Sequence, residues 1–137
     1  MQEKIKVLYD EWQRGGGLRT RDRLVATALG GEVVEAGGAP RVRWHHEGLV
    51  PEEELPTYTT NLNDAARAMD QAWEGVEEAA PVRILCQRDP NHPRQRGDCL
   101  VEWWPDEENH VATPRFASEA EGRAFAAFAF ARLKRQA

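Results

Sequence analysis

The chain has 137 residues, a length typical of one domain, and 41% of them are hydrophobic while 30% are charged. This balance excludes an ordinary disordered chain, and it excludes a membrane protein because the longest apolar helical run is the segment Phe125–Ala131, whereas a bilayer span needs about 20 residues. We therefore expect a single domain over residues 1–137, with an N-terminal helix and Gly-rich linker at 1–17 and a core at 18–137. The first residues contain no apolar export segment, so we expect reduced cysteines.

The net charge of −5 is unevenly distributed. Residues 47–78 contain nine acidic side chains and one basic side chain, Arg67. A nucleic-acid-binding protein usually gathers positive charge on one face, because neutralising phosphates supplies much of its affinity. The pattern therefore disfavours direct nucleic-acid binding and favours a basic protein partner. A nucleic-acid site formed by arginines of the 88–98 connection stays an alternative; these are Arg88, Arg94 and Arg96.

Two helices are predicted in the first 31 residues. Apolar residues at helical spacing indicate a helix over residues 3–13, which the triple glycine Gly15–Gly17 ends. Thr20 is expected to cap a second helix, and Gly30 and Gly31 to close it.

A hairpin is predicted over Glu32–His46, followed by a long polar loop over Glu47–Thr57. Loops of this length in small domains are often functional, and this one combines an acidic run with two apolar residues. We therefore take it as a candidate partner-binding segment. Its candidate residues are Leu49, Val50, Glu52, Glu53 and Glu54.

The strongest helical pattern covers residues 62–79, with Asn61 as the expected N-cap. Two strands follow, Val82–Gln87 and Cys99–Trp104, and a shorter one is expected within His110–Thr113.

The last predicted helix runs to about Arg135. Ser118 and Glu121 form a capping box at its start, and its apolar residues cover more than half of its circumference. With strands mostly in hairpins and helices too numerous for one face, we expect an α+β fold. Its sheet would be mostly antiparallel, with about four to five strands and helices on both faces, as an α/β/α sandwich.

Trp103 and Trp104 are neighbours on one predicted strand, so their side chains must point to opposite faces. Both belong to the core if helices cover both faces of the sheet. Otherwise Trp104 is an exposed aromatic anchor of the type enriched at protein interfaces, and it joins the candidate partner-binding residues.

A zinc site is one reading of Cys86, His92, Cys99 and His110, because cysteine and histidine are zinc ligands. Structural zinc sites usually use closely spaced cysteine pairs, and none is present here. We therefore favour two buried cysteines and two solvent-facing histidines, with a zinc site or a strained regulatory disulfide as alternatives. A small metal-binding or accessory enzyme using Cys86 and Cys99 is therefore the alternative function.

Other catalytic patterns are weak. His45 and His46 precede Glu47, but neighbouring residues on a strand point apart, so the two imidazoles do not converge. The chain's single serine, Ser118, is already assigned as a helix cap. We therefore expect no catalytic residues, no metal and no cofactor.

The segment Leu55–Glu74 reads LPTYTTNLNDAARAMDQAWE. It resembles the phage ABA-sandwich domain family, whose members carry P-x-Y-(S/T)-T-(D/N) followed by an Ala-rich helix containing A-W-E. The matching residues are Pro56, Tyr58, Thr59, Thr60, Asn61, Ala72, Trp73 and Glu74. Asn61 replaces the usual acidic residue, and either type caps a helix well.

The resemblance implies a phage protein with the sandwich fold. Within the family, the size, arginine-rich composition and acidic middle are most similar to regulators that bind the host RNA polymerase. The implied partner is the polymerase holoenzyme, at the β-subunit flap and the C-terminal region of the σ factor. The implied effect is inhibition of promoters that depend on the −35 element, in the host cytoplasm, without an enzymatic activity, a membrane or direct nucleic-acid contact.

Overall fold

A computed structural model of the chain describes residues 2–45, 51–74, 82–88, 96–106 and 108–136. These residues form an α+β fold, as predicted. The helices are α1 (Gln2–Arg14), α2 (Leu18–Ala28), α3 (Leu62–Trp73) and α4 (Glu119–Gln136). The strands are β1 (Gly31–Ala36), β2 (Ala39–Trp44), β3 (Glu52–Glu54), β4 (Val82–Arg88), β5 (Arg96–Trp103) and β6 (Val111–Ala112). No helix in these ranges is both long and apolar enough to cross a bilayer.

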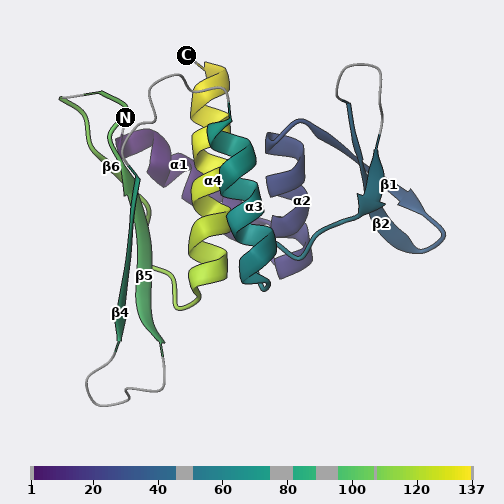
Figure 1. Cartoon of the computed structure of the whole chain (residues 1–137), viewed down its shortest axis with the longest axis horizontal. Helices are drawn as coiled ribbons and strands as arrows, with labels where there is room; N and C mark the ends of the chain where they lie inside the picture. Colours follow the sequence, from purple (N-terminus) through teal and green to yellow (C-terminus); the bar gives the residue numbers. More distant parts are fainter. Residues whose placement is uncertain (1, 46–50, 75–81, 89–95, 107, 137) are drawn as a thin grey trace.

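The described strands form two separate antiparallel sheets of three strands each, in the orders β1-β2-β3 and β4-β5-β6. The helices lie between these two sheets (Figure 1). The predicted single sheet of four to five strands with helices on both faces is therefore not confirmed. The order of layers is reversed, with helices inside and one small sheet on either side.

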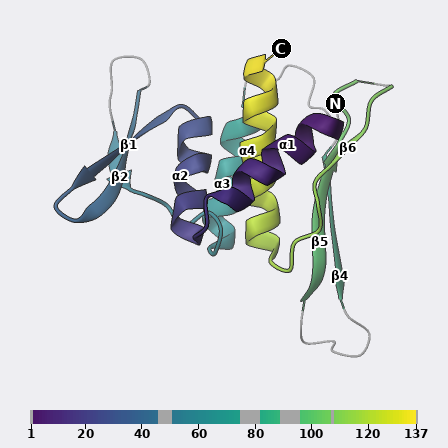
Figure 2. The ribbon, with the colours of Figure 1, turned by 180° about the vertical axis from the view of Figure 1, so that it is seen from behind.

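The apolar character of α4 explains this reversal. Phe125 and Phe128 are fully buried, and the Trp12 ring of α1 meets the Phe125 ring edge-on with centroids 5.3 Å apart. The helix contacts α1, α2, α3 and β5, and α1 lies across it (Figure 2). A helix that is apolar around most of its circumference must be covered on several sides, which one sheet cannot do. α4 therefore takes the centre of the molecule.

Two of the three predicted helix caps are confirmed. The Asn61 side chain accepts a hydrogen bond from the Asp64 N–H at 3.0 Å, and Ser118 Oγ accepts one from the Glu121 N–H at 3.2 Å. The prediction for Thr20 is wrong, since α2 begins at Leu18 and has no side-chain cap. Gly16, with φ +85°, turns the chain directly into α2, so the helix starts before Thr20 is reached.

Candidate partner-binding surface

The acidic run predicted as loop forms strand β3, which pairs with β2 in the register Arg41↔Glu54 and Arg43↔Glu52. The Glu52 carboxylate accepts hydrogen bonds from the guanidinium groups of Arg41 at 2.9 Å and Arg43 at 3.3 Å. These two bonds hold the pKa of Glu52 below its ordinary value. Opposite charges on neighbouring strands stabilise their pairing, which explains why this polar segment is a strand. The two apolar residues predicted to precede it in the binding segment, Leu49 and Val50, lie outside the described residues.

Glu53 points to the other face of the sheet, because side chains alternate along a strand. Its carboxylate accepts hydrogen bonds from Arg67 of α3 at 2.6 Å and from the Trp44 indole at 3.2 Å. The bond from Glu53 raises the pKa of Arg67. Glu53 therefore joins the sheet to α3, and its role within the fold is structural.

Glu54 is the exposed acidic residue that these internal contacts leave available. It lies opposite Arg41 in register, but the Arg41 guanidinium is engaged by Glu52. Of the three glutamates, Glu54 is thus the one that no ion pair engages within the described parts of the chain. A basic partner could form an ion pair with Glu54 without breaking an ion pair of Glu52 or Glu53.

Trp104 lies in the other sheet, as a half-buried residue just after β5, while its neighbour Trp103 is 1% exposed. The predicted division of this pair between two faces is confirmed. The Trp104 ring is tilted against the His110 ring, with centroids 4.9 Å apart, and the Arg83 guanidinium lies 5.7 Å from its centre. Trp104 therefore packs within a charged cluster while remaining half-buried, and its role as an aromatic anchor stays a prediction.

The cluster around Trp104 is organised by Glu102, whose side chain is 7% exposed. This carboxylate pairs with Arg83 and accepts a hydrogen bond from His110 Nε2 at 2.6 Å. Burial alone would raise the pKa of Glu102, but the bonds from His110 and Arg83 outweigh it and hold that pKa below its ordinary value. Removing either partner would leave the buried carboxylate less compensated, so these contacts have a structural role. The sequence pattern indicates other roles for Trp104 and His110, and it does not point to Glu102 or Arg83.

The predicted partner-binding residues do not form one surface. Glu52, Glu53 and Glu54 belong to the β1–β3 sheet, whereas Trp104 follows β5 in the β4–β6 sheet. The helices separate the two sheets in both views (Figures 1 and 2). A single partner contacting both groups would have to reach around the helical layer. The β1–β3 sheet and the Trp104 cluster are therefore separate candidates.

The family-like segment is anchored by a buried aspartate that sequence reasoning did not identify. Asp22 of α2 is 1% exposed, and its Oδ1 accepts hydrogen bonds from the Thr59 N–H and hydroxyl, both at 2.9 Å. Arg19 bonds to the other Asp22 oxygen and also to the carbonyls of Leu55 and Pro56. The segment between β3 and α3 is thereby fixed to α2. Pro56 and Thr59 of the motif thus hold the segment next to β3 in place, and their contacts are with residues of this chain.

The two cysteines face each other across β4 and β5, with Cα atoms 4.2 Å apart, and form a disulfide. The expectation of reduced cysteines is therefore corrected, and the disulfide alternative describes the arrangement. In the described ranges no three or more His, Cys, Asp and Glu side chains converge as a metal site needs. His110 is engaged by Glu102, and His92 lies outside the described residues.

The histidines considered for catalysis do not form a dyad in the described structure. His45 Nε2 pairs with Glu32 of β1 at 3.1 Å, on an exposed part of the sheet. His46 and Glu47 lie outside the described residues. His45 therefore belongs to the row of polar contacts on the β1–β3 sheet.

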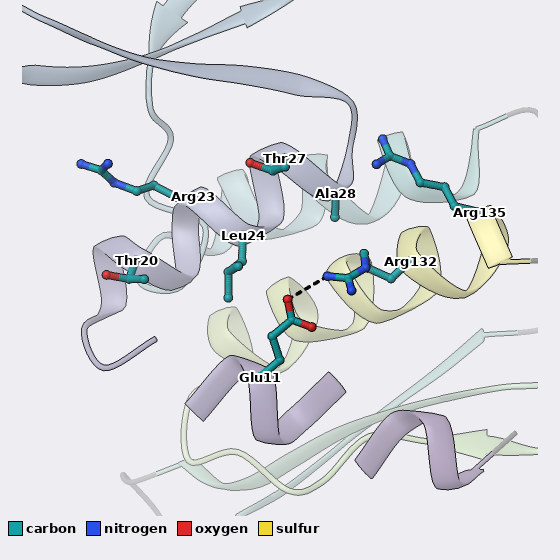
Figure 3. A pocket seen from close by; sticks show the side chains of 8 residues that line it. All are labelled: Glu11, Thr20, Arg23, Leu24, Thr27, Ala28, Arg132 and Arg135. Carbon is teal, nitrogen blue, oxygen red and sulfur yellow. Dashed lines mark hydrogen bonds and ion pairs between the residues drawn. The ribbon is translucent and has the colours of Figure 1, made fainter. Parts of the chain in front are cut away.

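A cleft of about 390 Å³ lies between α1, α2 and α4 (Figure 3). Three arginines contribute to its walls, yet Arg132 is bonded to Glu11 at 3.0 Å and Arg23 is paired with Glu35 of β1. In Figure 3 the Arg23 side chain points away from the Arg132–Glu11 pair, while Leu24 points into the cleft. The guanidinium groups do not converge on one point, so the cleft has no preformed anion site.

No family model, curated protein or solved structure matches this chain. The family resemblance at Leu55–Glu74 therefore stays a prediction from the motif.

Proposed function

We propose that the chain is a non-enzymatic phage protein of the ABA-sandwich family that binds the RNA polymerase of its bacterial host. Its targets are the β flap and the C-terminal region of the σ factor, and its effect is reduced transcription from promoters that depend on the −35 element. The observation that carries this proposal is the Leu55–Glu74 segment, which matches the family pattern from Pro56 to Glu74.

Electrostatics support the β1–β3 sheet as the contact surface. A σ region that reads DNA is basic, because it must contact phosphates. Glu54 is exposed at the end of β3, and the Asp22–Thr59 bonds hold the segment that follows it against α2. The backbone that presents Glu54 is therefore held in place, and the exposed carboxylate offers charge complementarity to a basic partner.

The ion pairs of the three glutamates determine which substitution tests this surface with the least disturbance of the fold. Reversing the charge of Glu52 would leave two arginines unpaired, and reversing that of Glu53 would break the contact to Arg67. Either change would alter the fold as well as the surface. Glu54→Lys breaks no described ion pair, but it places a cation opposite Arg41 in the β2–β3 ladder, so a denaturation curve checks that the variant keeps its fold. Glu108→Lys, on the exposed connection between β5 and β6, is the matched control on the opposite side of the molecule.

The first experiment is a pull-down with the tagged protein from extract of a thermophilic bacterial host, with and without added σ factor. We expect polymerase to co-purify in a manner that depends on σ or on the β flap. Binding constants for purified holoenzyme are then measured for wild type, Glu54→Lys and Glu108→Lys at two salt concentrations. We expect Glu54→Lys alone to weaken binding, by about threefold to tenfold, and to reduce its salt dependence.

The two parts of the proposal fail separately. Absence of polymerase from the wild-type pull-down, together with no binding to purified holoenzyme, would refute the function. Wild-type binding that Glu54→Lys and Glu108→Lys leave equally unchanged would refute the β1–β3 sheet as the contact surface while leaving the function in place.

A further inference from the structure

Strand β4 is the outer strand of the β4–β6 sheet, and β5 is its only partner among the described strands. The strand is seven residues long and contains neither proline nor glycine. Val82 and Leu85 are 38% and 37% exposed, large values for apolar side chains. The edge strand β3, in contrast, has three residues, and all of them are glutamates. Short, charged edges resist pairing with another chain, whereas long apolar edges favour it.

The hydrogen bonds of β5 show which backbone groups of β4 point away from β5, toward the edge that no other described strand covers. Val101 donates its N–H to Thr113 Oγ1 and accepts the Thr113 N–H at its carbonyl, so both of its backbone groups face β6. Cys99 exchanges both of its backbone bonds with Phe116 on the same side. Backbone bonding alternates along antiparallel strands, so the residues opposite these two, Ile84 and Cys86, direct their N–H and C=O groups away from β5. The same alternation applies to Val82.

We propose that this open edge pairs with β4 of a second copy of the chain, antiparallel about a two-fold axis at Ile84. The two three-stranded sheets then join into one sheet of six strands, with the helices of both copies on the same face. A two-fold interface requires a surface that is complementary to itself. The open backbone groups of Val82, Ile84 and Cys86 meet this requirement, since Val82 of each copy lies opposite Cys86 of the other.

Charge is compatible with a second copy as the occupant and disfavours the register centred on Arg83. With the axis at Ile84, each Arg83 lies opposite Leu85 of the other copy, so no like charges face each other within Val82–Cys86. Moving the axis by one residue to Arg83 would place two guanidinium groups directly opposite, which destabilises a strand pair. The exposed Val82 and Leu85 side chains gain cross-strand neighbours in the Ile84 register.

Sedimentation equilibrium and amide hydrogen exchange on the purified wild-type protein test this proposal without any polymerase. We expect a concentration-dependent monomer–dimer equilibrium. The amides of Val82, Ile84 and Cys86 should exchange about tenfold more slowly or more at concentrations where the dimer dominates. The amides of Arg83 and Leu85, which alternate toward β5, should change little and provide an internal control.

Ile84→Pro is the decisive variant, because it removes an N–H that faces away from β5 and leaves the internal ladder intact. Val33→Pro is its matched control in β1. The Pro40 carbonyl accepts a hydrogen bond from the Leu55 N–H, and the Trp44 N–H donates to the Pro51 carbonyl, so Pro40, Val42 and Trp44 direct their backbone groups toward β3. Val33 lies opposite Val42. Its N–H and C=O therefore point away from β2, toward the outer edge of β1. We expect Ile84→Pro to be a monomer with the wild-type circular dichroism spectrum, and Val33→Pro to remain a dimer.

If Ile84→Pro does not fold, Val82→Pro at the first residue of β4 makes the same test at a less buried position. A wild-type protein that stays monomeric, with the Val82 and Ile84 amides exchanging at unprotected rates, would overturn the proposal. A dimer that survives proline in β4 would overturn it as well, because the interface would then lie elsewhere.

Discussion

Replacing Asp22 by alanine should destabilise the protein more than any substitution at the exposed glutamates. The carboxylate is 1% exposed and accepts two hydrogen bonds from Thr59, which is itself 2% exposed. Removing it leaves the Thr59 N–H without an acceptor in a buried position. The Thr59 hydroxyl keeps a poor alternative, the Leu18 carbonyl at 3.5 Å.

The expected loss follows from these contacts. An orphaned buried donor costs about 1–3 kcal/mol, and the hydroxyl adds a smaller amount because it can turn toward Leu18. The ion pair between Asp22 and Arg19 adds about 0–1 kcal/mol, since the Arg19 side chain is 46% exposed and screened by solvent. We therefore expect Asp22→Ala to lower the free energy of unfolding by about 2–4 kcal/mol, a large part of the roughly 5–15 kcal/mol typical of a domain.

Urea denaturation followed by circular dichroism measures this loss, with Asp22→Asn as the matched control. The amide oxygen that this substitution introduces can still accept from Thr59, so the variant should lose only about 1 kcal/mol. Combining Asp22→Ala with Thr59→Ala removes the orphaned hydroxyl together with the carboxylate, so the double variant should lose less than the sum of the single losses. A loss below about 0.5 kcal/mol for Asp22→Ala, or equal losses for both Asp22 variants, would refute the role assigned to this side chain.

Two further predictions address the Trp104 cluster and the close packing of the chain. Because the pKa of Glu102 is lowered in the folded state, its contribution to stability is present above the ordinary pKa of 4.5 and is lost as the pH falls through the lowered value. Glu102→Gln should therefore be less stable than wild type near neutral pH, and this difference should shrink in acid; denaturation curves from about pH 7 to about pH 3 with a constant difference would contradict this. Gly31→Ala should cost about 1–3 kcal/mol, because an added Cβ would lie 2.6 Å from Val42 Cγ1 and 2.9 Å from Trp44 Cζ3. Gly122→Ala in α4 should instead stabilise by about 0.5–1 kcal/mol, since its nearest contacts are at 3.7 Å, and thermal melts of both variants distinguish the two environments.

Local features of the fold could be predicted from the sequence, because they depend on neighbouring residues. The apolar spacing and the Asn61 cap placed the start of α3 at Leu62, and the Ser118 capping box placed the start of α4 at Glu119. The hairpin of β4 and β5 followed from alternation in the same way. The predicted end of α3 at residue 79 lies outside the described residues, which end at Glu74 in this part of the chain.

Features that depend on contacts between distant segments could not be predicted. Strand β3 exists because Glu52 meets Arg41 and Arg43 across the sheet, and a run of glutamates has no strand propensity of its own. Asp22 looks like an ordinary surface residue until Thr59, 37 positions later, is brought beside it. The separation into two sheets likewise depends on which elements cover α4, and the residue pattern of the strands does not indicate that.

The internal roles of the motif residues bear on where a partner can bind. Tyr58 is fully buried, Thr59 is bonded to Asp22, and Asn61 caps α3. A residue occupied in this way cannot also contact a partner without unfolding its surroundings. A partner that recognises this segment would therefore contact exposed positions next to the motif, of which Glu54 is one. Substitutions at the motif should reduce partner binding only in proportion to the stability that they remove, whereas Glu54→Lys should weaken binding by more than its effect on stability explains.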